Sequence, residues 1–336
     1  MLTREILEKY DLSGMYKIYD MWPEISHKAY ESDLEPIHFD NIDHIVFAGM
    51  GGSGAIGDLF SSILSKSDIH VSLVKGYLLP KTVDKNTLVI ATSISGNTNE
   101  TMTVLDSTKK LDCNSIAFFS GGKMEEFCNK NKIHFRKIEQ THSPRSSFCT
   151  FTYSILKTLN SMLPIKKNDI IESLNELNKT QKQISSQNLS DSNPAINLAR
   201  WISGIPLIYY PHGLQPVATR FKSSLQENVK THAIIEDIVE ACHNGIVSWE
   251  KPSSVQPILL RGNNDYVKTK ERFDIVREYF VENNIDFREV RSVPGNILTK
   301  IIALIYLLDY ASIYRAILSK TDPSPVHSID YIKKRI

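Results

Sequence analysis

The sequence predicts an α/β protein with two doubly wound parallel sheets. Three observations support this fold class. Short apolar runs alternate with segments of helical spacing through most of the chain, which is typical of parallel sheets with crossover helices. Turns rich in glycine and hydroxyl groups follow two of the early apolar runs. The alternation stops in a polar interval and then starts again, so we expect two similar halves.

Composition and charge exclude several classes of protein. The chain has 336 residues, of which 41% are hydrophobic and 23% are charged, as in a globular protein with room for two domains. A formal net charge of +1 provides no field that would attract nucleic acid or an acidic membrane surface. Apolar runs are shorter than the roughly 18 residues of a transmembrane helix. We therefore expect neither nucleic acid nor a membrane as a partner.

Cysteine usage and the N-terminus indicate a reduced compartment. The cysteines are Cys113, Cys128, Cys149 and Cys242. They show no C-x-x-C spacing, so no zinc site is expected. The N-terminal stretch is amphipathic and carries acidic side chains, unlike a signal peptide. These features predict a cytoplasmic protein without a metal site.

The first half of the chain is expected to contain a helical segment and a first sheet. Residues 1–40 have helical spacing with an interruption near Pro23. The first domain is expected at 41–163, where short apolar runs separated by helical segments predict five strands. These strands are expected at 43–48, 70–74, 87–92, 115–119 and 133–138. A helix over 148–163 then leaves the sheet.

The second half repeats this organisation after a polar interval. Residues 164–192 are rich in Lys, Asn, Gln and Ser and are expected to form a helical connector. The second domain is expected at 193–320, followed by a C-terminal tail helix at 321–336. Its strands are expected at 206–210, 232–235, 255–260 and 287–290, and its helices at 214–230, 265–282 and 296–318. The last of these helices is very apolar and is expected to be buried or to lie at a subunit interface.

A turn rich in hydroxyl groups at 92–101 is the first candidate binding site. It follows a buried strand and leads into a helix, with Thr98 or Asn97 expected as the N-cap. A helix start presents free N–H groups and the positive end of the helix dipole. The hydroxyls around this point belong to Ser93, Ser95, Thr98 and Thr101. The pattern predicts a phosphate cradle without a lysine or a metal ligand, and the alternative is an ordinary capped turn that binds nothing.

Glycines after the first strand form a second candidate. Gly49, Gly51 and Gly54 match the G-x-G-x-x-G pattern of dinucleotide sites. However, the second strand ends without the acidic residue that holds a ribose, and the Gly-Lys-Ser/Thr of a P-loop is missing. Carboxyl ends of neighbouring parallel strands border one crevice, so Gly51, Gly52 and Ser53 are expected beside the hydroxyl-rich turn. One small phosphorylated ligand would suit both loops better than a dinucleotide.

These motifs resemble known families. The loop at Gly49–Gly54 together with Ser93–Thr98 resembles the sugar isomerase (SIS) domain, which implies a flavodoxin-like, three-layer αβα architecture in each half. The second half resembles the bifunctional phosphoglucose/phosphomannose isomerases of archaea and some bacteria. The matching stretches there are Arg220–Lys230, Glu240–Asn244, Trp249, Asp322–Val326 and Ile329–Lys333. The resemblance extends from about residue 40 to the end of the sequence.

The resemblance also implies site residues and an assembly. Glu227 matches the family's catalytic base, and His243 matches a ring-opening histidine that the neighbouring subunit supplies. Arg145 matches the arginine beside the reacting carbons. Lys333 matches a lysine near the substrate, in a register that the adjacent Lys334 leaves open. The implied phosphate site consists of Ser53, Ser93, Ser95 and Thr98. The resemblance implies a homodimer with its active site at the subunit interface and without a cofactor.

The implied reaction is the interconversion of glucose 6-phosphate or mannose 6-phosphate with fructose 6-phosphate through a cis-enediol(ate). A base must move a proton between C2 and C1, and we expect burial to raise the pKa of Glu227 from its ordinary value of about 4.3 toward neutrality. Arg145 would stabilise the enediolate, and His243 would transfer the ring-opening proton. The alternatives are a non-catalytic SIS protein that senses a phosphosugar and an amidotransferase-type isomerase half that acts on an amino sugar.

Overall fold

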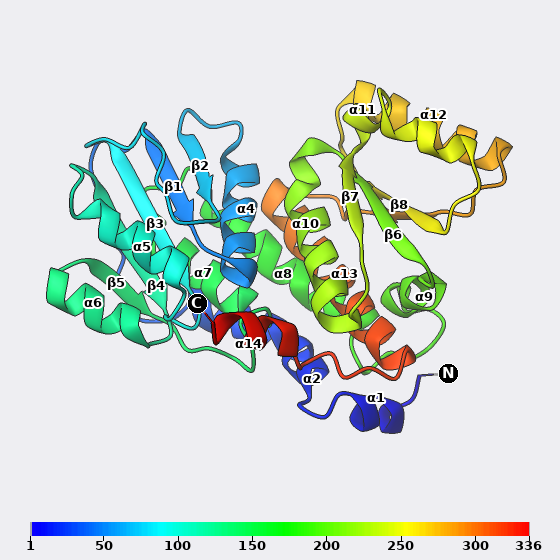
Figure 1. Ribbon diagram of the computed structural model, residues 1–336, viewed down its shortest axis with the longest axis horizontal. Helices are drawn as coiled ribbons and strands as arrows, with labels where there is room; N and C mark the ends of the chain where they lie inside the picture. The colour runs from blue at the N-terminus through cyan, green and yellow to red at the C-terminus, as the bar shows by residue number, and fades with distance from the viewer. Residues whose placement is uncertain (1, 336) are drawn as a thin grey trace. The chain divides into compact units, whose positions relative to one another are not determined.

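The computed structural model describes residues 2–335, which divide into two compact units (Figure 1). The first-sheet unit consists of Met21–Leu174, and the second-sheet unit combines Met1–Asp20 with Asn175–Ile336. Each unit contains one parallel sheet and several helices. The fold class predicted from the sequence, two doubly wound α/β units, is confirmed.

The sheet of the first-sheet unit has the strand order β2-β1-β3-β4-β5, with every pair parallel. Its strands are β1 (His44–Ala48), β2 (His70–Val74), β3 (Thr87–Ser93), β4 (Asn114–Phe119) and β5 (His134–Lys137). Its helices are α3 (Trp22–Tyr30), α4 (Gly51–Leu64), α5 (Asn99–Thr108), α6 (Lys123–Asn131) and α7 (Phe148–Thr158), and α8 (Lys167–Ile184) continues into the other unit. The expected strands of this half are all confirmed, each to within about one residue at either end.

Strands β1 and β3 lie side by side in this sheet and are buried along their whole length. Alternate side chains of a strand face opposite sides of the sheet. Phe47 stacks on Phe60 of α4, with ring centroids 5.1 Å apart, whereas Val46 packs in a cluster with Val104 of α5. Helices therefore cover both faces of the sheet. Because the strand order reverses between β1 and β3, the crevice at their carboxyl ends is where a doubly wound fold binds its ligand.

The sheet of the second-sheet unit has the order β7-β6-β8-β9 and is also parallel. Its strands are β6 (Ile205–Tyr210), β7 (Ile234–Asp237), β8 (Val255–Arg261) and β9 (Arg288–Arg291). Its helices are α1 (Arg4–Tyr10), α2 (Met15–Asp20), α9 (Pro194–Trp201), α10 (Gln215–Ser224), α11 (Ile238–Ala241), α12 (Val267–Glu282), α13 (Ile297–Leu318) and α14 (His327–Lys333). Strand β7 is shifted two residues toward the C-terminus from the expected 232–235. It ends at Asp237, which caps α11 by accepting a hydrogen bond from Val239 N at 2.8 Å.

Aromatic side chains form much of the core of the second-sheet unit. Tyr209 of β6 packs in one buried cluster with Trp249 and with Phe280 of α12. The indole nitrogen Nε1 of Trp249 donates a hydrogen bond to the Tyr209 hydroxyl at 2.8 Å. Burial raises the pKa of Tyr209 to about 12, so this hydroxyl remains a neutral hydrogen-bonding group.

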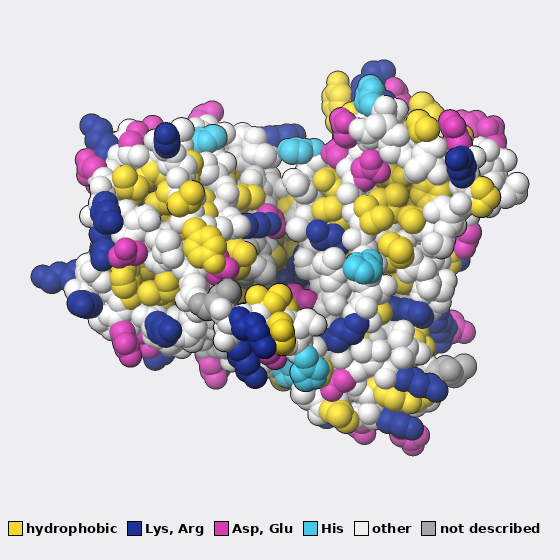
Figure 2. All heavy atoms as spheres, in the orientation of Figure 1, with side chains coloured by type: hydrophobic (Ala, Val, Ile, Leu, Met, Phe, Trp, Pro, Cys, Tyr) yellow, Lys and Arg dark blue, Asp and Glu magenta, His cyan; other side chains and the backbone are white. Residues whose placement is uncertain are grey.

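Helix α13 is the long apolar helix of the second-sheet unit. Its length and composition would allow it to cross a membrane, but 83% of its most apolar stretch is buried inside the protein, as in a core helix. The expectation that this helix is buried is confirmed. The hydroxyl of Tyr306 donates to the main-chain oxygen of Tyr19 at 2.6 Å, which attaches α2 to this unit. On the surface shown in Figure 2, basic and acidic side chains are interspersed over most of the face.

Candidate functional site

The glycine loop after β1 and the hydroxyl-rich turn after β3 are in direct contact. The hydroxyl of Ser53 accepts a hydrogen bond from Ile94 N at 3.1 Å. A side chain on Gly49 would place its Cβ 3.0 Å from the main-chain oxygen of Thr92, so a glycine here allows the two segments to approach closely without a shift of the backbone. The carboxyl ends of β1 and β3 thus form one continuous polar edge inside the first-sheet unit.

The turn from Ser93 to Thr98 has a fixed shape. Gly96 has a φ of +67°, and a Cβ at this position would lie 1.6 Å from the main-chain oxygen of Gly121. The side chain of Asn97 spans the turn, donating to Ser95 O at 2.9 Å and accepting from Lys123 N at 3.1 Å. These contacts hold the loop before any ligand arrives, which lowers the entropic cost of binding.

The hydroxyls of this turn differ in accessibility. Thr98 is the N-cap residue of α5, but its side chain makes no capping hydrogen bond. Ser93 is fully buried and donates its hydroxyl to Thr98 Oγ1 at 2.9 Å. Ser95 is half-buried. Ser93 therefore orients the Thr98 hydroxyl, and the hydroxyls of Ser95 and Thr98 are the more accessible pair.

Two glycines at the start of α4 complete the polar edge. Gly51 has a φ of +53°, and a Cβ there would meet no other atom within 4 Å, so this position faces open space. The first N–H groups of an α-helix have no partner within the helix, and the adjacent dipole favours a negative charge. Gly51 and Gly52, the first residues of α4, are therefore placed to meet an anion.

Arg145 lies against the glycine loop within the same unit. A Cβ on Gly52 would come within 3.1 Å of Pro144 O and 3.4 Å of Arg145 Cα, so the missing side chain allows the two segments to touch. Arg145 is only 6% exposed and precedes α7. Hydroxyl contacts hold the surrounding turn, including Ser147 Oγ, which accepts from Thr141 N at 3.0 Å. A buried cation is thus fixed beside the edge formed by Ser53 and the hydroxyl-rich turn.

Glu227 lies in the second-sheet unit, in a short stretch of π-helix. Helix α10 continues into this turn, Leu225–Val229, which ends where Lys230 adopts a left-handed conformation and donates its N–H to Leu225 O. The Glu227 side chain is half-buried. The Lys230 ammonium group donates to the main-chain oxygens of Glu227 and Pro325. A π-helical turn inside an α-helix is rare and is frequently found at a functional site.

His243 and Lys333 are both exposed on the second-sheet unit. His243 follows α11, and its N–H donates to Glu240 O at 2.9 Å. The neighbouring Asn244 donates its side-chain amide to Glu240 Oε1 at 2.8 Å, which braces this loop. Lys333 ends α14, and Lys334 beside it is equally exposed. Both side chains are therefore accessible to a ligand or to a second subunit.

The sequence-predicted residues are divided between the two units. The first-sheet unit contains the hydroxyl and glycine positions with Arg145, and the second-sheet unit contains Glu227, His243 and Lys333. Sequence motifs do not reveal the buried polar side chains next to the Glu227 turn, which belong to Ser224, Asn228, Asp309 and Ser312. A lone aspartate inside the most apolar helix is the signal that could have identified them.

The chain offers little to a metal ion. Across residues 2–335, no group of three or more His, Cys, Asp or Glu side chains has a metal-binding arrangement. All four cysteines are free, and burial raises the pKa of Cys128 to about 11, so that thiol is not a ready source of thiolate.

Comparison with known proteins identifies the family. A model of the SIS domain matches residues 38–163, and a model described as the bacterial phospho-glucose isomerase C-terminal SIS domain matches residues 191–336. A bifunctional phosphoglucose/phosphomannose isomerase of Caldicellulosiruptor bescii is 31% identical over 337 residues, covering 95% of this chain and 97% of the relative. A D-glucosamine-6-phosphate 4-epimerase of Sulfolobus acidocaldarius is 28% identical over 252 residues, covering 73% of this chain and 77% of the relative.

A solved structure supports the same fold. A hypothetical protein of Thermus thermophilus superposes with a TM-score of 0.76 at 14% identity, covering 98% of this chain and 91% of that one. At such low identity the likeness shows the fold alone. The similarity to the C. bescii relative spans nearly the full length of both proteins. The chain therefore belongs to the bifunctional phosphoglucose/phosphomannose isomerase family.

Proposed function

We propose that the protein is an aldose–ketose isomerase that interconverts glucose 6-phosphate and mannose 6-phosphate with fructose 6-phosphate through a cis-enediol(ate). The observation that supports this most strongly is family membership over nearly the whole chain. The rigid hydroxyl-rich turn of the first-sheet unit is evidence that the substrate carries a phosphate group. The carboxylate of Glu227 provides a base that can transfer the proton.

The phosphate group of the substrate binds at the carboxyl ends of β1 and β3. The N–H groups of Gly51 and Gly52 and the hydroxyls of Ser53, Ser95 and Thr98 donate to its oxygens, with Ser93 behind Thr98. Hydrogen bonds to a charged group contribute about 1.5–3 kcal/mol each. Three or more of them, on a loop that is already rigid, would anchor the sugar without a lysine.

The chemistry occurs at C1 and C2, at the other end of the sugar. His243, supplied by the neighbouring subunit of a homodimer, helps to open the ring by transferring a proton. Glu227 then removes the proton from C2 of the aldose and returns it to C1, because one carboxylate can serve in both directions. Arg145 stabilises the negative charge of the enediolate, and Lys333 lies near the substrate. The same planar intermediate serves both epimers if it can turn about C2–C3.

The remaining properties of the proposed enzyme follow from this chemistry. Moving a proton between adjacent carbons changes no overall oxidation state, so the reaction needs no redox cofactor. In the proposed mechanism the side chains of Glu227, His243 and Arg145 do the chemistry without a metal. A homodimer with its active site at the subunit interface allows His243 to reach the partner's substrate. A cytoplasmic location is part of the proposal, because its substrates are hexose phosphates.

The experiment that tests the proposal is a coupled assay on the purified protein. Fructose 6-phosphate is supplied with and without EDTA, and glucose 6-phosphate and mannose 6-phosphate are detected separately. We expect both products, at rates that EDTA leaves unchanged. Turnover that EDTA abolishes and a divalent ion restores would contradict the metal-free mechanism.

The same assay separates the competing functions. Tight binding of fructose 6-phosphate without turnover would favour a non-catalytic phosphosugar sensor. Because one relative is named as a D-glucosamine-6-phosphate 4-epimerase, glucosamine 6-phosphate is included as a second substrate. Epimerisation of this amino sugar, with no turnover of fructose 6-phosphate, would overturn the proposed substrate.

A further inference from the structure

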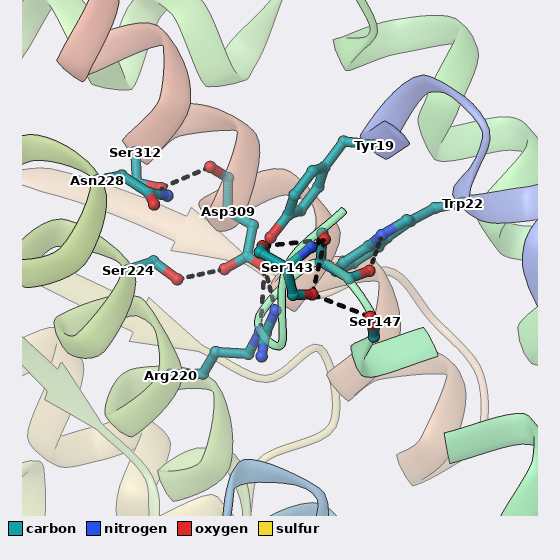
Figure 3. Close-up of polar contacts among 10 residues, drawn as sticks. Tyr19, Trp22, Ser143, Ser147, Arg220, Ser224, Asn228, Asp309 and Ser312 are labelled. Atoms are coloured by element: carbon teal, nitrogen blue, oxygen red, sulfur yellow. Dashed lines mark hydrogen bonds and ion pairs between the residues drawn. The ribbon is translucent and has the colours of Figure 1, made fainter. Parts of the chain in front are cut away.

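Asp309 is a buried carboxylate in the middle of the apolar helix α13. It is fully buried and accepts hydrogen bonds from three residues on two other helices of the second-sheet unit, α2 and α10 (Figure 3). The donors are the Tyr19 hydroxyl at 3.0 Å, Arg220 Nε at 3.0 Å, Arg220 Nη2 at 2.6 Å and the Ser224 hydroxyl at 2.7 Å. A buried charge is tolerated only when it is paired and its hydrogen bonds are made, and these contacts satisfy both conditions.

A second polar contact lies one turn further along α13. Ser312 accepts a hydrogen bond from Asn228 Nδ2 at 2.8 Å and donates its own hydroxyl to Asp309 O at 2.6 Å. Both Ser312 and Asn228 are fully buried, so water does not compete for these groups. Figure 3 shows the two contacts beside each other, Ser224 with Asp309 and Asn228 with Ser312.

These two contacts lie on either side of Glu227. Ser224 ends α10, and Asn228 lies in the π-helical turn that follows. Helix α13 therefore hydrogen-bonds to the chain both before and after the proposed base. The two α13 residues that make these hydrogen bonds, Asp309 and Ser312, are three positions apart, and side chains three positions apart lie on the same face of an α-helix.

The π-helical turn determines where Glu227 points. Its main-chain hydrogen bond joins residues five positions apart, whereas that of an α-helix joins residues four positions apart. Relaxation to α-helical geometry would rotate the residues beyond it by about 100°, the angle between successive residues of an α-helix. A turn of this kind persists only where its surroundings hold it. The contacts from Asp309 and Ser312 are positioned to do so.

We propose that Asp309 and Ser312 are positioning residues, which hold the π-helical turn and thereby aim the Glu227 carboxylate at the substrate. The inference rests on the proposed function, in which Glu227 is the base. Arg220 and Tyr19 contribute to this positioning, because Arg220 balances the charge of Asp309 and both hold its carboxylate in place by hydrogen bonds. A displacement of a reacting group by about 1 Å can cost a hundredfold in rate, so even a small shift of this turn is measurable.

The test compares Ser312→Ala with a matched control on the same helix, Tyr314→Phe. The Tyr314 hydroxyl is also buried and donates to Ile184 O at 2.8 Å, away from the turn. Each variant loses one buried hydroxyl together with the hydrogen bonds that it makes. The measurements are kcat and KM for fructose 6-phosphate, the thermal midpoint, and deuterium exchange of the amides at 225–230, all on the full-length protein.

We expect Ser312→Ala to lower kcat by about tenfold or more, to leave KM within about twofold, and to speed exchange at 225–230. Tyr314→Phe should lower the thermal midpoint by a similar amount while leaving kcat and this exchange unchanged. Unchanged kcat in Ser312→Ala, unchanged exchange at 225–230, or an equal loss of kcat in Tyr314→Phe would each overturn the inference. If the unaltered protein shows no turnover, the proposed function fails, and the exchange comparison alone decides whether α13 holds the turn.

Discussion

The loops after β3 and β8 occupy equivalent places in two sheets of similar topology, yet they are built differently. Each strand lies next to the first strand of its sheet and leads through a short turn into a helix. After β3 the turn presents hydroxyls, with Ser95 and Thr98 accessible. After β8 the carboxylate of Asp265 accepts a hydrogen bond from Gly262 N at 2.7 Å, and burial raises its pKa.

This difference teaches that topology alone does not make an anion site. In the second-sheet unit the Asp265 carboxylate already accepts the hydrogen bond of the Gly262 N–H in the turn, and its negative charge would repel a phosphate. In the first-sheet unit the corresponding turn lacks an acidic side chain between Ser93 and Thr98. Function therefore depends on the loops rather than on the fold, and we expect only the first-sheet unit to anchor the substrate's phosphate.

Among substitutions in these two turns, the largest effect on KM is expected for Gly96→Ala in the turn after β3. The new Cβ would overlap the main-chain oxygen of Gly121, so the turn must move and its hydroxyls leave their positions. Losing two or more hydrogen bonds to a charged group should raise KM for fructose 6-phosphate by about a hundredfold or more. Steady-state kinetics on the folded variant measure this change.

The matched control for this substitution lies in the second-sheet unit. Gly213 follows β6, and a Cβ there would meet no atom within 4 Å. Gly213→Ala should therefore leave KM within about twofold. A KM that rises equally in both variants would mean that the turn after β3 has no special role.

A smaller effect is expected for Ser95→Ala, which removes one hydroxyl and leaves the turn in place. Loss of one hydrogen bond to a phosphate oxygen should raise KM by about tenfold with little change in kcat. Asp265→Asn in the equivalent turn should leave KM unchanged, because that turn binds no phosphate. If Asp265→Asn instead alters KM while Ser95→Ala does not, the assignment of the two turns is reversed.

The smallest effect concerns pH and the first strand of each sheet. His44 begins β1 and is buried, whereas β6 begins with Ile205, which does not titrate. Burial lowers the pKa of His44, and the nearby His70 lowers it further. The folded state therefore binds fewer protons than the unfolded state. The stability that neutral, buried His44 allows is present above its ordinary pKa of about 6.5 and is lost as the pH falls through the lowered value.

We therefore expect the amides of β1 to lose protection from deuterium exchange below about pH 6.5, more than those of β6. Exchange at each pH is corrected for its intrinsic rate. In His44→Gln the two strands should respond alike. A pH dependence of β1 that persists in this variant would show that another group is responsible.

Much of the first sheet could be predicted because its signals are local. Strands β1 and β3 are buried on both faces, so they appear in the sequence as continuous apolar runs, and the glycines after β1 mark the turn. In contrast, the π-helical turn at Glu227 could not be predicted. Its geometry is associated with contacts to α13, which lies more than 80 positions away in the sequence, and a helical pattern does not reveal such contacts.

The candidate site was predictable only in part, for a related reason. Hydroxyl and glycine positions could be grouped because parallel strands bring their carboxyl ends together. The sequence did not indicate that Ser93 would be fully buried behind Thr98, since accessibility depends on packing. The catalytic roles of Arg145, Glu227 and His243 stay predictions from the family resemblance.

The most direct test of the central claim, that the second-sheet unit supplies the base, is deuterium incorporation from D2O into bound hexose phosphate. Wild-type protein and Glu227→Gln are compared at saturating fructose 6-phosphate, after titration has shown that both bind it. We expect Glu227→Gln to bind within about threefold of wild type but to incorporate deuterium about a thousandfold more slowly. Incorporation at the wild-type rate in this variant would contradict the claim.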